Sequence, residues 1–210
     1  MRAEILAVGK PNITVAYKEI NLNNISRDQL RKLIPPHEPV VEDIPDRGLI
    51  YIFPDAGPLI CTIDKRRVRA ESETIEYVEQ VVKLAVGANR IVRKSHELIA
   101  YGFNYKWVLA VHDCAPVEFI TYMFLKDPES LSKKLGGEVA SSKFTILAKR
   151  NGNHILFDIS ISDQNLIFGA NMHYANPDRF PTAISLNKAF IKYDGYHYSA
   201  FKVYERIKPT

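Results

Sequence analysis

The sequence predicts an α+β protein with a mostly antiparallel sheet, on the strength of three observations. Residues 98–112 alternate between large apolar side chains and small or polar ones, which is the period of a strand. Alternating segments near 139–150, 153–162 and 165–174 follow one another through short turns and predict a three-stranded meander. Apolar residues at helical spacing occur between the strands, and we expect about four helices packed on the sheet.

Length and composition describe a globular protein. The chain has 210 residues, which allows one domain over 1–210 or two closely packed halves near 1–113 and 114–210. Its hydrophobic fraction is 46%, yet no apolar run is long enough to cross a bilayer, so we expect no membrane association. Two cysteines, Cys61 and Cys114, provide no disulfide framework and fit a reducing compartment. We therefore expect a cytoplasmic protein.

The N-terminal segment predicts short elements. Two strands are expected at 4–8 and 13–18, with a turn at 9–12 where Gly, Pro and Asn gather. Ser26 begins a capping box ahead of a short helix. Residues 35–47 are rich in proline and acidic side chains, so they predict a stiff, exposed connector rather than a packed element.

A hairpin and a helix are expected next. Leu49–Phe53 and Leu59–Asp64 predict the two strands of the hairpin, because Pro, Asp and Gly between them supply the turn. Ser72 is expected to cap a helix near 73–86. Gly87 would end that helix.

The strand at 98–112 would run roughly 45–50 Å, more than twice a typical strand, so we expect it to be bent or shared between two sub-sheets. We interpret its apolar face as core or as a subunit interface, since Tyr and Trp are favoured in both. Stacking of single-stranded bases is the alternative, but Lys106 points to the other face. The apolar face consists of Ile99, Tyr101, Phe103, Tyr105, Trp107, Leu109 and Val111.

The second half predicts a helix near 116–134 and then the meander. Asn151-Gly152 is a strong signal for a two-residue hairpin turn, and a second such turn is expected at 163–164. Residues 183–193 fit a helix or a strand, and a closing helix is expected near 196–207. The turns pair Ala148 with Ile155, Ile146 with Phe157 and Phe144 with Ile159, and they extend these rows to Met172, Ala170 and Phe168 on one buried face.

The same register predicts a polar cluster on the opposite face of the meander. Lys149, His154 and His173 fall in one cross-strand row, and Asn171 lies diagonal to His154. Opposed histidines about 5 Å apart at Cβ could share a ligand oxygen or a metal ion. The neighbouring lysine and the lack of a third protein ligand favour an anionic ligand, so we predict no metal and no cofactor. The alternative is an ordinary solvated sheet face.

His112, Asp113 and Cys114 form a weaker catalytic candidate at the end of the long strand. Imidazole beside a thiol could generate a nucleophilic thiolate. Residues two apart along a strand are about 6.5–7 Å apart, too far for a direct hydrogen bond without a bend. A turn containing a small buried cysteine is the alternative. Cys61 is expected in the core.

The densest basic run is Lys65, Arg66, Arg67 and Arg69, in a chain of net charge +4. One interpretation is a phosphate-binding patch for nucleic acid. The other is a solvated strand end balanced by the acidic residues that follow. The remaining Lys and Arg residues are scattered, which argues against nucleic acid as the partner.

Common catalytic motifs are absent from the sequence: it has no Gly-rich phosphate loop, nucleophile-elbow serine, Cys-x-x-Cys pair or His-Glu-x-x-His. We therefore expect a binding protein that recognises another protein or itself. A homodimer is the expected assembly, because long antiparallel sheets must cover their edges. A hydrolase-like enzyme with a dispersed His, Asp and Cys site is the alternative from another class, and nucleic-acid binding is the third.

Overall fold

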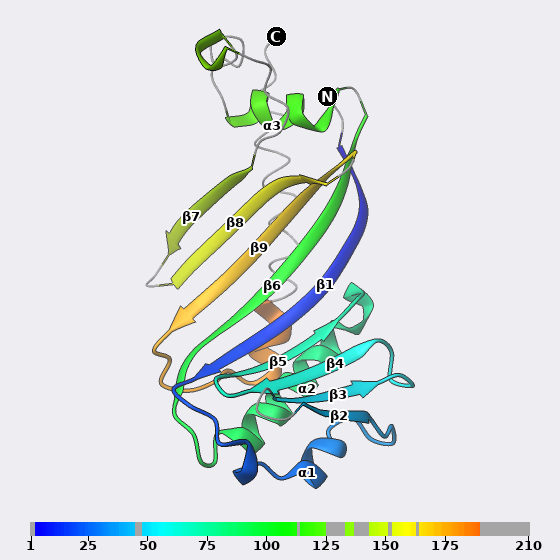
Figure 1. Ribbon diagram of the computed structural model, residues 1–210, viewed down its shortest axis with the longest axis vertical. Coiled ribbons are helices and arrows are strands. Elements are labelled where there is room, and N and C mark those ends of the chain that lie inside the picture. Colours follow the sequence, from blue (N-terminus) through cyan, green and yellow to red (C-terminus); the bar gives the residue numbers. More distant parts are fainter. Residues whose placement is uncertain are drawn as a thin grey trace. The chain divides into compact units, whose positions relative to one another are not determined.

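The computed structural model of the protein has the predicted α+β fold, with antiparallel strand pairs and helices packed on them (Figure 1). It describes residues 3–44, 48–112, 114–124, 133–136, 143–150, 153–162 and 164–189.

The strands are β1 (Ala3–Tyr17), β2 (Val40–Ile44), β3 (Gly48–Phe53), β4 (Leu59–Asp64), β5 (Arg67–Ser72), β6 (Leu98–Val111), β7 (Phe144–Arg150), β8 (Asn153–Ser162) and β9 (Asn165–Ala175). The helices are α1 (Arg27–Arg31), α2 (Val78–Val92) and α3 (Pro116–Phe124), with 3-10 turns η1 (Leu22–Asn24) and η2 (Ile75–Tyr77). Residues 133–135 and 183–189 are also helical.

Two compact units divide the chain. The meander unit contains Met1–Gly9 and Tyr105–Met172, and the α2 unit contains Lys10–Asn104 and His173–Thr210. Strands run in the order β1-β6-β9-β8-β7 in the meander unit and β2-β3-β4-β5-β1-β6 in the α2 unit. β6 continues from the α2 unit into the meander unit between Asn104 and Tyr105. The two units therefore share the long strand, as its length predicts. The predicted halves meeting near residue 113 stay a prediction.

The predicted turn at residues 9–12 is wrong, because one strand, β1, runs through it. β1 passes between the two units at Gly9–Lys10, and its pairing with β5 begins at Asn12. Pro11, which has no N–H, stands just before that ladder and removes no hydrogen bond from it. Turn-forming residues therefore mark the junction between units rather than a reversal of the chain.

The predicted connector at residues 35–47 is wrong in part. Val40–Ile44 forms β2, which pairs antiparallel with β3 from Val40 opposite Ile52 to Ile44 opposite Gly48. In the α2 unit β2 is an edge strand, and Pro39 directly precedes it. Proline is tolerated at the start of an edge strand, so it bounds β2 instead of excluding it.

The predicted helix at 73–86 is displaced towards the C-terminus. Ser72 ends β5, where its hydroxyl accepts a hydrogen bond from the Thr74 amide at 3.3 Å, and α2 begins only at Val78. The helix passes through Gly87 without ending there. A Cβ at Gly87 would lie 2.5 Å from Leu33 Cδ2, so this glycine permits close packing of the chain after α1.

The hairpin of β3 and β4 and the Ser26 cap of α1 are confirmed. Ser26 Oγ accepts a hydrogen bond from the Gln29 amide at 3.4 Å. Alternate side chains of β3, β4 and β5 are buried, and α2 contacts β4 and β5 on this inner face. The inner face is made of Leu49, Tyr51, Phe53, Leu59, Cys61, Ile63, Val68 and Ala70.

The meander forms with the predicted register between its first two strands. β7 and β8 pair Ala148 with Ile155, Ile146 with Phe157 and Phe144 with Ile159. β8 ends at Ser162 and β9 begins at Asn165, which leaves the predicted two residues between them, and the two strands are neighbours in the sheet as predicted. The residue-by-residue register of β8 with β9 stays a prediction.

Burial of the meander face is incomplete. Ile155, Ile159, Phe168, Ala170 and Met172 are buried, and Phe168 contacts the buried Trp107 with ring centroids 5.3 Å apart. Ile146 is 42% exposed, against the prediction, because β7 is the last strand of the sheet and has a neighbour on one side only. Phe144 and Phe157 are half-buried.

The long strand and the helix after it agree with the prediction over most of their length. Phe103, Trp107 and Leu109 of β6 are at most 3% exposed, so the aromatic face is core there. Ile99 is 40% exposed, and the prediction is wrong at that end. α3 begins at Pro116 as predicted. The remainder of the predicted 116–134 helix and the closing helix near 196–207 lie wholly or mostly outside the described residues.

Gly48→Ala should destabilise the α2 unit strongly. Gly48 has a φ of +154°, and a Cβ there would lie 2.4 Å from the Ile63 carbonyl oxygen. Backbone must then move where Gly48 pairs with both Ile44 and Asp64. We expect the free energy of unfolding to fall by about 2–4 kcal/mol in urea denaturation.

Gly136→Ala is the matched control for that experiment. Gly136 also has a positive φ, +68°, but nothing lies within 4 Å of the added Cβ. We expect a cost of about 1–2 kcal/mol from the left-handed conformation alone. Equal costs for the two variants would contradict the steric explanation at Gly48.

Candidate interaction surface

The predicted histidine row is placed only in part. Lys149 lies directly opposite His154 in the pairing of β7 with β8, as predicted. His154 and Asn171 are half-buried and His173 is exposed. His154 belongs to the meander unit and His173 to the α2 unit, so the proximity of the two rings stays a prediction.

The catalytic candidate at the end of the long strand also stays a prediction. β6 ends at Val111, so His112 and Cys114 lie beyond the strand, where His112 is exposed and Cys114 half-buried. Asp113 lies outside the described residues. Cys61 is fully buried, and its burial raises the pKa of the thiol to about 12, which confirms a core position.

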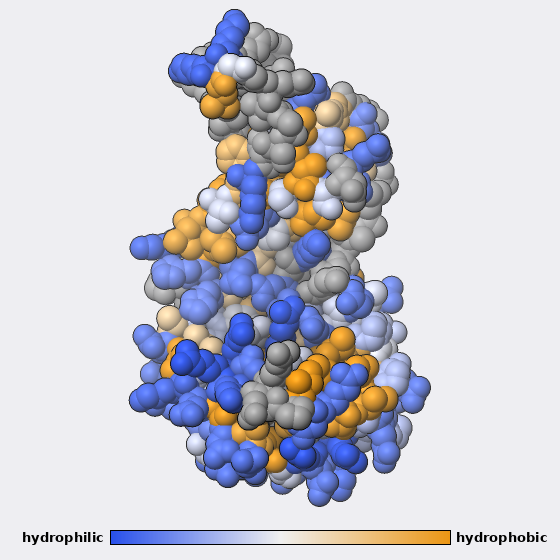
Figure 2. All heavy atoms as spheres, in the orientation of Figure 1, coloured by the Kyte–Doolittle hydropathy of each residue, from blue (hydrophilic) through white to orange (hydrophobic). Residues whose placement is uncertain are grey.

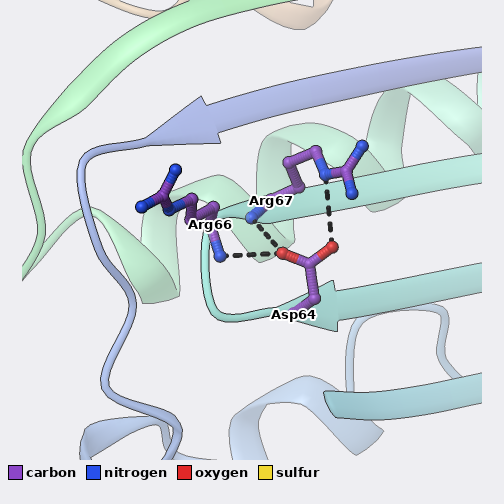
Figure 3. Close-up of polar contacts among 3 residues, drawn as sticks. All are labelled: Asp64, Arg66 and Arg67. Atoms are coloured by element: carbon purple, nitrogen blue, oxygen red, sulfur yellow. Dashed lines mark hydrogen bonds and ion pairs between the residues drawn. The ribbon is translucent and has the colours of Figure 1, made fainter. Parts of the chain in front are cut away.

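The basic run forms the tight turn between β4 and β5 (Figure 3). Asp64 Oδ1 accepts hydrogen bonds from the backbone amides of Arg66 at 2.7 Å and Arg67 at 2.8 Å. Its Oδ2 accepts one from Arg67 Nε at 3.2 Å. Arg69 forms an ion pair with Glu71 at 2.6 Å, so two of the four predicted nucleic-acid contacts are paired within the chain. Lys65 and Arg66 are exposed at the turn.

The outer face of strands β2 to β5, turned away from α2, presents apolar side chains to solvent. Val40 is 56% exposed and Ile44 37% exposed, while Ile50, Ile52 and Ile60 are half-buried. We call these five residues the outer patch. Figure 2 shows hydrophobic surface gathered over β3 and β4.

Strand register determines how the outer patch is arranged. Two rows of side chains cross β2, β3, β4 and β5 in that order. The first row is Glu42, Ile50, Thr62 and Arg69, and the second is Val40, Ile52, Ile60 and Glu71. In these rows β3 is apolar throughout, β2 and β4 each have one apolar and one polar residue, and β5 has charged residues only.

The two sides of the outer patch carry unlike charge. On the β2 side Glu42 is exposed, while the adjacent Asp43 is neutralised by Arg27 at 2.7 Å. On the β5 side the four cations of the turn and strand face two carboxylates, Asp64 and Glu71, which leaves two positive charges. The face therefore has one exposed carboxylate, Glu42, between Val40 and Ile44 at its β2 side, apolar residues on β3 and an excess of positive charge at its β5 side.

The sequence did not predict this surface, because the prolines and acidic residues of 35–47 indicated a connector where β2 lies. Without a strand at 40–44 neither row can be built across the sheet. The signal was present in the alternation of Val40, Glu42 and Ile44, but the surrounding prolines outweighed it.

Comparison with protein families and with curated proteins finds no match to this chain. Across the described ranges, no helix is long and apolar enough to cross a membrane. Over the same ranges, no three His, Cys, Asp or Glu side chains gather closely enough to hold a metal ion. The proposed function therefore rests on the geometry and chemistry of the outer patch.

Cys61 should react with a thiol reagent only when the protein unfolds. The thiolate is the reactive form, and a pKa near 12 together with full burial leaves almost none of it accessible at pH 8. In a Cys114→Ser variant, which retains Cys61 alone, we expect negligible labelling by Ellman's reagent in buffer. One thiol per chain should react in about 6 M guanidinium chloride, in which the chain is unfolded. Rapid labelling of the folded variant would contradict the core assignment.

Proposed function

We propose that the protein acts by binding rather than by catalysis, and that its partner is a second copy of the same chain held through the outer patch. One observation carries the proposal: exposed apolar side chains share one sheet face with a carboxylate, Glu42, at its β2 side and an excess of positive charge at its β5 side. Contiguous exposed apolar surface commonly marks an interaction site. Unlike charges on its two sides make the surface complementary to itself.

A twofold axis along the strands, between β3 and β4, satisfies both kinds of contact. Such an axis places β2 of one copy over β5 of the other, so Glu42 faces the partner's Arg69 and joins the ion pair that each Arg69 makes with Glu71 of its own chain. Ile52 then faces the partner's Ile60 in the middle of the interface. An axis across the strands would instead oppose two Glu42 side chains, which repel.

Face-to-face packing of two such sheets resembles a β-sandwich, in which facing side chains interdigitate across about 10 Å. Burial of the apolar centre provides the affinity, at about 25 cal/mol per Å² removed from water. The charged sides contribute orientation and the rate of encounter more than affinity. The outer patch therefore provides most of the binding free energy, and the pairs of Glu42 with Arg69 determine the relative orientation of the two copies.

A cytoplasmic location is part of this proposal. The buried Cys61 thiol is not in a disulfide, and two cysteines in 210 residues supply no oxidised framework.

Ile52→Lys should convert the dimer to a monomer. Ile52 is central in the outer patch, and the twofold axis would bury two lysine charges for each dimer. We expect the dissociation constant to rise roughly 100-fold, measured as mass by light scattering at tens of micromolar. Leu135→Lys, at a position 68% exposed and outside the patch, should leave the mass unchanged. A monomeric wild type, or a dimeric Ile52→Lys variant, would refute the interface.

Charge reversal tests the orientation of the two copies. Glu42→Arg and Arg69→Glu should each raise the dissociation constant roughly tenfold, because each turns two attractive pairs into repulsive ones. The double variant restores attraction and should return to within about threefold of wild type. Sedimentation equilibrium measures all four proteins, with thermal unfolding as the control for folding. Additive losses in the double variant would exclude the proposed axis.

A further inference from the structure

A cleft of about 650 Å³ lies on the inner side of the α2 unit, separate from the outer patch. The C-terminal half of α2 forms one wall, and residues 180–184, which lead into the helix at 183–189, form the other. That helix is drawn in orange in Figure 1. Volumes of this size are typical of small-molecule sites.

Hydrogen-bond donors converge on the cleft from α2. Asn89 and Arg90, in the last turn of α2, line it together with Arg93, which caps the helix, and Lys94 directly after it. None of the described residues that line the cleft is acidic. The wall therefore offers three positive charges, and no residue of the described lining supplies a carboxylate to neutralise them.

A buried hydrogen bond orients the neutral donor. Tyr17 is fully buried, and its hydroxyl donates to Asn89 Oδ1 at 2.6 Å. Burial raises the pKa of Tyr17, against a smaller opposing effect of the Arg93 charge, so the hydroxyl stays protonated and remains a donor. Asn89 is itself only 6% exposed, and no described residue accepts a hydrogen bond from its Nδ2.

The opposite wall is apolar and firmly supported. Phe180 is 7% exposed and meets Tyr101 edge-on, with ring centroids 5.3 Å apart. Tyr101 stacks in turn on Tyr174 at 4.6 Å. At the mouth, Ile184 is 70% exposed. The cleft thus combines a cationic wall with a rigid apolar wall and an apolar lip.

We infer that this cleft binds an organic oxyanion, with an acidic head on the α2 wall and an apolar body against Phe180 and Ile184. Arg90, Arg93 and Lys94 would hold the head by charge-assisted hydrogen bonds, and Asn89 Nδ2 would add a neutral one. Three neighbouring cations favour a head of two negative charges, such as a phosphate monoester, over a carboxylate.

Cations near the end of a helix also interact favourably with its dipole, which is a sufficient reason for Arg93 and Lys94 alone. The dipole does not explain the open cleft beside them, the absence of acidic lining residues or the buried Asn89 amide. These three features have one explanation in common, a bound anion.

A matched series of probes tests the head group: 1-naphthyl phosphate, 1-naphthoate and 1-naphthol share one apolar body. Titrated into the full chain and followed by calorimetry, the phosphate should bind at least tenfold more tightly than naphthol, with naphthoate between them. Inorganic phosphate should compete with naphthyl phosphate. Naphthol binding as tightly as the phosphate, or no binding of the phosphate at millimolar concentration, would overturn the inference.

Substitutions then locate the probe. Arg90→Ala and Arg93→Ala should each weaken naphthyl phosphate binding at least fivefold. Lys83→Ala removes one charge from an exposed position of the same helix outside the cleft, and it should change affinity less than twofold. Equal losses in all three variants would mean general attraction to a basic protein and would overturn the site.

Tyr17→Phe tests the positioning of Asn89. It leaves every charge of the cleft in place but releases Asn89 Oδ1, so we expect a loss of about threefold for naphthyl phosphate and no change for naphthol. If the variant is unfolded by circular dichroism, Asn89→Asp replaces it, because a carboxylate there should repel the phosphate and lower its affinity more than tenfold. Unchanged phosphate affinity in a folded variant of either kind would remove Asn89 from the site.

Discussion

Burial of one face of strands β4 and β5 against α2 is the constraint on which the rest of the α2 unit depends. Strand side chains alternate, so placing Cys61 and Val68 under the helix obliges their neighbours in sequence to face the other way. The pairing of Leu49 with Ile63 extends the same alternation to β3. The outer patch is therefore a consequence of core formation. Its apolar side chains have no role in that core, which is why a second copy is the occupant we propose.

The same packing determines what α2 can offer to a ligand. Its buried residues include Val81, Leu84, Ala85 and Ala88, which lie on the side of the helix that packs on the sheet. The cations of the cleft lie at the end of the helix, at Arg90, and directly after it, at Arg93 and Lys94. Asn89 lies between the core and the cleft. Its Oδ1 accepts the hydrogen bond from the buried Tyr17, and its Nδ2 is the atom that we propose as a donor to the ligand. One buried hydrogen bond thus connects the stability of the unit to its proposed site.

Predictions from sequence succeeded where the determining interaction is local. The Asn151-Gly152 signal predicted the β7–β8 register correctly, because a two-residue loop allows one pairing only. Predictions failed where tertiary packing outweighed a local signal. Gly87 has the residue type of a helix end, but it lies within α2, where the absence of a side chain leaves room for Leu33. Ile146 has the period of a buried residue, but it lies on an edge strand.

The sequence by itself determined the fold class, the long strand and the meander, since each follows from a period of two or from the chemistry of one turn. It also determined that Cys61 belongs to a core. Only the tertiary structure decided that residues 40–44 pair as an edge strand and that residues 180–184 approach the end of α2. The physical reason is separation along the chain: both surfaces combine residues whose contact depends on packing of the whole unit, and no local pattern encodes that contact.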